Sequence, residues 1–120
     1  MLKVLAITLL SLLPVTATAE PVLLMVEEDG CYWCAKWNEE IAHIYPKTVE
    51  GRTAPLQRYD LYRDTPDVVF DKRVQFTPTF ILVKDGREVG RIEGYPGEDF
   101  FWGLLTKMFE QAGIPLDQAS

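Results

Sequence analysis

The sequence contains few cysteine and histidine residues, the side chains that most often bind zinc. Among its 120 residues there are two cysteines and one histidine, His43. A structural zinc site usually takes four ligands, mostly cysteine and histidine. Because His43 is distant from the cysteine pair, we expect no metal site and no bound cofactor, and we interpret His43 as a solvated surface residue.

The sequence also lacks an excess of basic side chains. Twelve Lys and Arg residues stand against 18 Asp and Glu residues, which gives a net charge of −6. Such acidity argues against binding to nucleic acid and to anionic membrane surfaces. The apolar segment 4–13 is too short to span a bilayer as a stable helix.

Residues 1–19 have the pattern of a secretory signal peptide. Lys3 precedes the apolar segment, and Ala17-Thr18-Ala19 fits a cleavage site. We expect a signal peptide over residues 1–19 and one domain over residues 20–120, with an uncleaved anchor as the alternative. After cleavage the domain would have a net charge of −7 and no segment inserted in the membrane. In an oxidising compartment its cysteines stay oxidised unless a reductant is supplied.

The two cysteines lie one helical turn apart in Cys31-Tyr32-Trp33-Cys34. An apolar strand and the turn Asp29-Gly30 precede them, so we expect Cys31 at the start of a helix. Free backbone N–H groups there favour a thiolate, which predicts a lowered pKa for Cys31. Cys34, one turn further, is expected to be shielded. An exposed attacking thiol beside a shielded resolving thiol is suited to thiol–disulfide exchange. A purely structural disulfide and two free core cysteines are less favoured alternatives.

The first half of the domain predicts a β-α-β unit with parallel strands. We expect a buried strand at residues 22–26, a helix from the cysteines to about Tyr45, and a second strand at 56–61. The inward face of the helix is expected to carry Cys34, Trp37, Ile41 and Ile44. Residues 47–54 are expected to be mainly a loop, with one helical turn as the alternative, and residues 67–73 could form a short helix.

The second half predicts a β-hairpin and a final helix. Residues 76–83 and 88–93 are expected to be strands joined at Lys84-Asp85-Gly86-Arg87, with Pro78 where the first of them begins. The final helix is expected at about 98–112. Its apolar stripe is predicted to be core and contains Phe100, Phe101, Leu104, Leu105, Met108 and Phe109.

These elements together resemble the thioredoxin superfamily. The resemblance rests on the C-x-x-C pair, on Pro78-Thr79 followed by an apolar run and Lys84-Asp85-Gly86, and on Gly94. It implies an α/β thioredoxin-like fold, with a central mixed four-stranded sheet of order 2-1-3-4 flanked by helices. It also implies a cis Thr77–Pro78 bond facing the cysteines. One departure is Met25, where thioredoxins carry a buried Asp, so the proton acceptor for Cys34 must be another group, with Glu27, Glu28 or water as candidates.

A closer resemblance is to the periplasmic thioredoxin-like proteins of bacterial sulfur-oxidation clusters, the SoxS type. It rests on Gly30-Cys31-Tyr32-Trp33-Cys34-Ala35, on Tyr45-Pro46-Lys47-Thr48 and on the segment that begins Gly94-Tyr95-Pro96-Gly97. This resemblance implies a periplasmic location and a partner that is a cysteine-bearing sulfur-carrier protein.

We therefore expect an exported, monomeric thiol:disulfide oxidoreductase that acts mainly as a reductase, with a membrane thiol transporter as its electron donor. Its substrate would be a protein disulfide or thiol in the periplasm. The alternatives are a disulfide oxidase or isomerase and a non-catalytic binding module. The predicted catalytic residues are Cys31 and Cys34. The predicted substrate-binding residues are Thr77, Pro78 and Gly94, together with Tyr32, Trp33 and Tyr95, which would form an apolar rim with Pro96.

Overall fold

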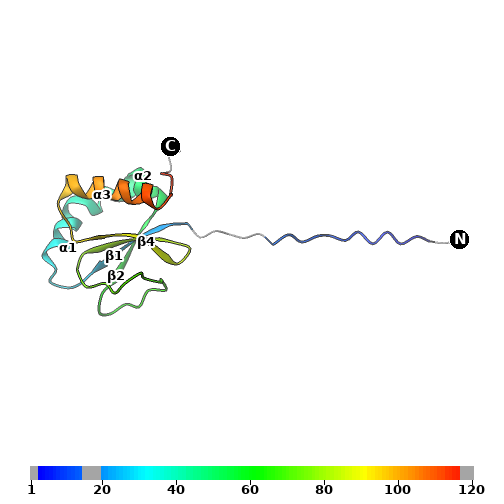
Figure 1. The fold of residues 1–120 in the computed structure, drawn as a ribbon, viewed down its shortest axis with the longest axis horizontal. Helices are drawn as coiled ribbons and strands as arrows, with labels where there is room; N and C mark the ends of the chain where they lie inside the picture. The colour runs from blue at the N-terminus through cyan, green and yellow to red at the C-terminus, as the bar shows by residue number, and fades with distance from the viewer. Residues whose placement is uncertain (1–2, 15–19, 117–120) are drawn as a thin grey trace.

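The computed structural model describes residues 3–14 and 20–116 and shows one mixed sheet with helices on one side (Figure 1). The sheet order is β2-β1-β3-β4, as predicted. Strand β1 is parallel to β2 and antiparallel to β3, which is antiparallel to β4. The strands are β1 (Val22–Glu27), β2 (Leu56–Asp60), β3 (Thr79–Lys84) and β4 (Arg87–Glu93), and the long final helix is α3 (Glu98–Gln111).

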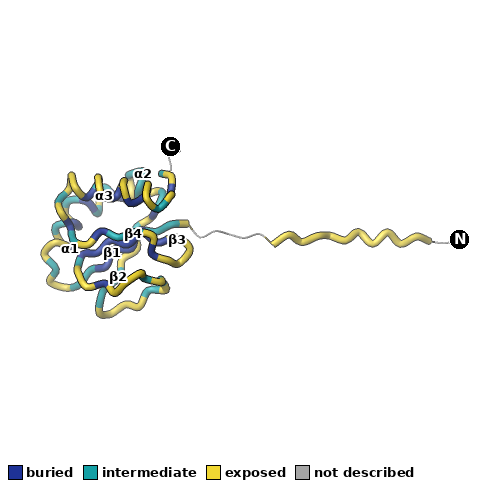
Figure 2. The backbone as a smooth tube through the Cα atoms, in the orientation of Figure 1, coloured by how far each residue is buried: buried dark blue, intermediate teal, exposed yellow. Residues whose placement is uncertain are grey.

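The two faces of the sheet are covered differently. Helices cover one face, where Met25 and Phe80 pack with Trp37 and Phe101 in the larger core cluster. The irregular segment 61–76 covers the other face, and its Val74 packs on Ile81 in a smaller cluster. Figure 2 shows the buried backbone concentrated in the sheet and in the helix faces turned toward it. The cysteines belong to the helical side, because Cys34 is part of the larger cluster.

The segment before the domain has no regular secondary structure where it is described. Residues 3–14 are exposed throughout, and the predicted cleavage site at residues 17–19 lies outside the described residues. Among the described residues, no helix is long and apolar enough to cross a membrane.

The helix that carries the cysteines is less regular than predicted. It consists of α1 (Tyr32–Trp37), which continues as the π-helical segment η1 (Asn38–Ala42), and the 3₁₀ turn η2 (Tyr45–Lys47) follows. A π-helical turn holds an extra residue and therefore rotates the face that follows it. Consequently Tyr45 is fully buried, whereas Ile44, predicted to face inward, is partly exposed.

Residues 47–54 contain the short helix α2 (Val49–Thr53), which corresponds to the single helical turn considered for this segment. Thr48 caps this helix. Its hydroxyl accepts a hydrogen bond from the Gly51 N–H at 3.0 Å and donates one to the Tyr45 carbonyl at 2.6 Å. An N-cap of this kind satisfies a helix N–H group that otherwise lacks a partner.

The possible helix at residues 67–73 does not form. Val69 instead bridges to Arg87: its N–H donates to the Gly86 carbonyl, and its carbonyl accepts from the Glu88 N–H at 3.0 Å. The edge strand β4 therefore provides backbone partners that replace those of a helix. This pairing holds segment 61–76 against the sheet.

A buried ion pair fixes the same segment. The register of β3 and β4 shifts between Leu82 and Val83, so β4 has a bulge there. Because of this bulge, Glu88 and Arg91 lie on the same face of β4 although they are three residues apart. Their side chains are at least 90% buried, and Arg91 also donates to the Lys72 carbonyl at 2.8 Å. The hydrogen bond to Glu88 raises the pKa of Arg91.

We predict that Glu88→Gln lowers the free energy of unfolding by about 2 kcal/mol, because it removes charged hydrogen bonds inside the protein. The matched control is Glu93→Gln, whose partner Lys72 is largely exposed, and it should cost less than about 1 kcal/mol. Urea unfolding curves measure both. Equal losses would contradict a buried role for Glu88.

The final helix confirms only part of the predicted apolar stripe. Phe101, Leu105, Met108 and Phe109 are buried, but Phe100 is 72% exposed and Leu104 is 44% exposed. Successive residues turn by about 100° around a helix, so a stripe of six cannot all face one sheet. The prediction that Phe100 and Leu104 belong to the core is therefore wrong.

Candidate active site

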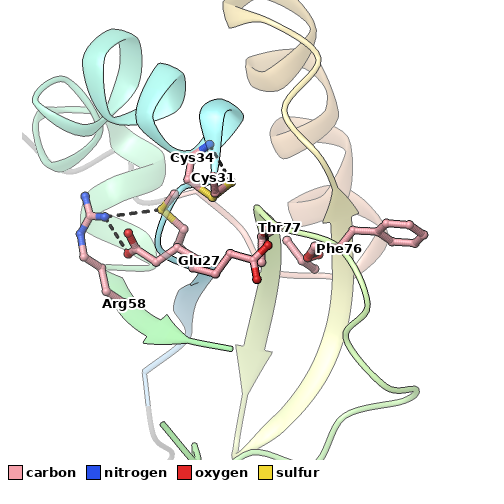
Figure 3. The surroundings of a disulfide bond; sticks show 9 residues. Glu27, Cys31, Cys34, Arg58, Phe76 and Thr77 are labelled. Carbon is pink, nitrogen blue, oxygen red and sulfur yellow. Dashed lines mark hydrogen bonds and ion pairs between the residues drawn. A yellow bond between two sulfur atoms is a disulfide. The ribbon is translucent and has the colours of Figure 1, made fainter. Parts of the chain in front are cut away.

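Cys31 and Cys34 are joined by a disulfide, with their Cα atoms 5.2 Å apart (Figure 3). Cys31 is the N-cap of α1, and its sulfur accepts a hydrogen bond from the Cys34 N–H at 3.1 Å. Its side chain is partly exposed, whereas Cys34 is only 3% exposed. The positions match the predicted pair of an outer and an inner sulfur.

The turn before Cys31 explains how the helix start is positioned. Strand β1 ends at Glu27, and Gly30 has a φ of 75°, a left-handed conformation that glycine adopts without steric cost. The Cys31 N–H then donates to the Glu28 carbonyl. The predicted turn at Asp29-Gly30 thus directs the chain from the sheet into α1.

Thr77 and Pro78 are joined by a cis peptide bond, as the family resemblance implied. The Thr77 hydroxyl donates to the Glu28 carboxylate at 2.8 Å, which links this loop to the one before Cys31. The Pro78 carbonyl accepts from the Gly94 N–H at 2.7 Å. Thr77 therefore lies among the residues that surround the disulfide, as Figure 3 shows.

The predicted apolar rim is only partly present. Tyr32 and Trp33 are 67% and 52% exposed, and their rings meet edge to face at 4.9 Å. Pro96 is also exposed. Tyr95, however, is 6% exposed and donates its hydroxyl to Glu40 at 2.9 Å. Burial, followed by the Glu40 contact, raises the pKa of Tyr95. Tyr95 is thus a packing residue, and its assignment to an exposed rim is wrong.

Sequence reasoning missed Arg58, which lies beside Met25 in the β1–β2 register. Its guanidinium donates to Glu27 and to the Asn38 side chain, each at 2.8 Å, and lies over the Trp37 ring at 6.0 Å. Figure 3 shows Arg58 and Glu27 below the helix that carries the cysteines. The alternating pattern of residues 56–61 could have indicated which side chains of β2 face this helix, but not which partners they meet.

An open surface depression adjoins the disulfide. Both cysteines line it, together with Glu27, Glu28 and Asn38. No group of three metal-binding side chains occurs in the ranges that the structure describes. What the site presents is a redox-active sulfur pair with carboxylates beside it.

Comparison with known proteins decides the family. Residues 11–109 match the family described as thioredoxin-like domain. The chain belongs to this thioredoxin-like family. No curated protein gave a significant match.

Several solved thioredoxin structures share the fold. One is the crystal structure of the periplasmic thioredoxin SoxS from Paracoccus pantotrophus in its reduced form, whose sequence is 50% identical to this chain. The match covers 78% of this chain and 99% of the SoxS chain, with a TM-score of 0.75. A Helicobacter pylori thioredoxin-fold protein is 19% identical, with coverages of 78% and 70% and a TM-score of 0.58. Thioredoxin-2 of the malaria parasite is 18% identical, with coverages of 72% and 82% and a TM-score of 0.53.

These findings assign an enzymatic activity to the thioredoxin-like chain. The similarity to SoxS extends over nearly all of that protein, and the Cys31–Cys34 pair is at disulfide distance. The protein is a thiol–disulfide oxidoreductase. The two more distant structures support the fold alone.

For this thioredoxin-like site we predict that alkylation of the reduced protein near neutral pH modifies Cys31 well before Cys34. The physical reasons are the partial exposure of Cys31 and its place at the start of the helix, where a thiolate is favoured. Mass spectrometry of peptides after short exposure to iodoacetamide measures the order. Equal rates, or earlier modification of Cys34, would contradict the assigned positions.

Proposed function

We propose that the protein is an exported reductase that keeps the cysteine of a periplasmic partner reduced. The observation that carries this proposal is the contrast between the two sulfurs: Cys31 is reachable from solvent, and Cys34 is 3% exposed. The 50% identity to a periplasmic thioredoxin supports the same compartment. The signal peptide proposed for residues 1–19 supplies the route.

The reaction begins with the reduced pair. The Cys31 thiolate attacks the partner's disulfide, forms a mixed disulfide and releases one partner thiolate. Cys34 loses its proton and attacks the Cys31 sulfur, which forms the Cys31–Cys34 disulfide and releases the second partner thiolate. Two electrons pass from the pair to the partner. In this cycle the Cys31–Cys34 disulfide is the oxidised product, and the short distance between the two residues supports its formation.

The backbone beside Thr77 supports a docking role for this loop. Thr77 is partly exposed, and its backbone forms no hydrogen bond within the described part of the chain. An extended partner segment can therefore pair with it next to Cys31. Pro78 and Gly94 would shape this edge, and the exposed rings of Tyr32 and Trp33 would contact the partner.

Continued reduction needs an electron source on the exported side of the membrane. We infer a membrane thiol transporter, because the periplasm is kept oxidising and has no reducing glutathione buffer. The partner inferred from the resemblance to SoxS-type proteins is a cysteine-bearing sulfur-carrier protein. We infer that this chain binds it as a monomer.

The test of the proposal is capture of the partner by Cys34→Ser. Without the resolving thiol, the mixed disulfide on Cys31 should accumulate. A pull-down from periplasmic extract should yield a covalent adduct that dithiothreitol releases and that contains a sulfur-carrier protein. The matched control is Cys31→Ser, which should give no adduct. Equal capture by both variants would overturn the assigned roles.

A further inference from the structure

We propose that Glu27 takes the proton from Cys34 when the mixed disulfide is resolved, and that Arg58 is the residue that positions it. This inference rests on the proposed function. Because a thiol is a poor nucleophile, Cys34 must lose its proton before it attacks. Met25 belongs to the same core cluster as Cys34, and its apolar side chain cannot accept a proton. The acceptor must therefore come from the rim of the site.

The alternation of β1 places Glu27 on the correct side. Side chains two residues apart on a strand share a face, so Glu27 lies on the face of Met25, at the point where β1 ends. Its side chain is 24% exposed, and it lines the same open depression as Cys34. Solvent water in that depression can carry a proton between the two groups.

Arg58 fixes the Glu27 carboxylate relative to the helix. One guanidinium nitrogen donates to Glu27 at 2.8 Å, and the other donates to Asn38, which directly follows α1, at 2.8 Å. The guanidinium also packs over Trp37, three residues after Cys34. The same side chain therefore connects the carboxylate with the helix that carries the thiol.

The two neighbouring carboxylates have partners that do not reach the cysteine-bearing helix, whereas Arg58 links Glu27 to Asn38. Glu28 accepts a hydrogen bond from the Thr77 hydroxyl at 2.8 Å. Asp29 is 89% exposed and forms an ion pair with Arg63. The charged or titratable groups that line the two depressions beside Glu27 are Glu28, Asp29, Cys31, Tyr32 and Cys34 near its own strand end, and Arg58, Tyr59, Asp60, Arg63 and Asp64 along β2 and the following turn.

In the proposed step the Cys34 proton passes to Glu27 as the Cys34 sulfur attacks Cys31. The new S–S bond forms, the bond from Cys31 to the partner breaks, and the partner leaves as a thiolate. Glu27 then returns the proton to that thiolate or to solvent. No further oxidant or reductant is required.

The experiment follows both steps in one stopped-flow trace. Reduced protein mixed with dithiobis(nitrobenzoate) releases one thionitrobenzoate when Cys31 attacks and a second when Cys34 resolves. For Glu27→Gln we expect the first phase unchanged within about twofold, which also reports an intact fold. The rate of the second phase should fall about 10-fold near pH 6.5. This loss is smaller than the rate contribution usual for a general acid–base group, because solvent water competes as proton acceptor. This deficit should shrink toward pH 9 as hydroxide replaces the carboxylate.

Glu28→Gln is measured as the competing candidate, because Glu28 also lines the depression. The matched control is Glu39→Gln, the same change at a side chain that is 74% exposed and lies outside the depression. Both variants should leave the second phase within about threefold of the unmodified protein. Arg58→Met should slow the second phase with the same pH dependence as Glu27→Gln. A slow phase in Glu28→Gln alone, or a deficit in Glu27→Gln that is constant across the pH range, would overturn the proposal. Release of only one thionitrobenzoate per molecule of unmodified protein would instead refute the proposed function.

Discussion

Cys31→Ser is expected to abolish the reduction of protein disulfides. The serine hydroxyl is not ionised near neutral pH and cannot form the mixed disulfide, and Cys34, at 3% exposure, cannot reach a protein substrate in its place. We expect the rate of insulin reduction with dithiothreitol as electron donor to fall at least ~10³-fold, to the rate of dithiothreitol alone.

Trp33→Ala is the control, because it removes a large exposed ring between the two cysteines and leaves both sulfurs in place. It should retain insulin reduction within about 10-fold, with any loss expressed in substrate affinity. Substantial activity in Cys31→Ser would mean that Cys34 is the attacking sulfur, which would contradict the exposure that the structure gives to each residue.

Phe101→Ala is expected to destabilise the fold severely. The Phe101 ring is fully buried. Its centroid lies 5.9 Å from that of Trp37 and 4.9 Å from that of Phe80. The ring therefore joins the cysteine-bearing helix, the sheet and α3. Truncation leaves a cavity at this junction and should lower the free energy of unfolding by about 4 kcal/mol.

Phe100→Ala is the matched control, since the same change is made one residue earlier at a side chain that is 72% exposed. It should change the free energy of unfolding by less than about 0.5 kcal/mol. Guanidinium unfolding followed by circular dichroism measures both variants. Comparable losses would contradict the assignment of one ring to the core and the other to solvent.

The parts of the fold that short motifs encode could be predicted from the sequence. The apolar strand before Cys31, the Lys84–Arg87 hairpin and the helix after Gly97 each have local signals, and the sheet order follows from their resemblance to thioredoxins. Cys31 and Cys34 could be identified for the same reason. Their spacing already indicates that they can meet.

Features that depend on contacts between distant segments could not be predicted. The π-helical turn that buries Tyr45 and the bridge from Val69 to Arg87 replace local preferences with tertiary partners. Arg58 was missed because its contacts depend on the β1–β2 register, which no residue pattern specifies. Tyr95 was misassigned because the sequence does not show whether an aromatic residue beside an active site is packed or exposed. Its hydrogen bond to Glu40, a residue distant in sequence, holds the ring in the packed position.

The reduction potential of the Cys31–Cys34 pair tests the central claim most directly. Strongly oxidising proteins of this fold often carry a histidine between the cysteines to stabilise the thiolate, whereas this chain has Tyr32 and Trp33. Equilibration with glutathione or dithiothreitol buffers, read by tryptophan fluorescence or by alkylation, gives the potential. A reductase predicts a value below about −200 mV. A value near about −120 mV, typical of strong thiol oxidants, would contradict the proposed direction of electron flow.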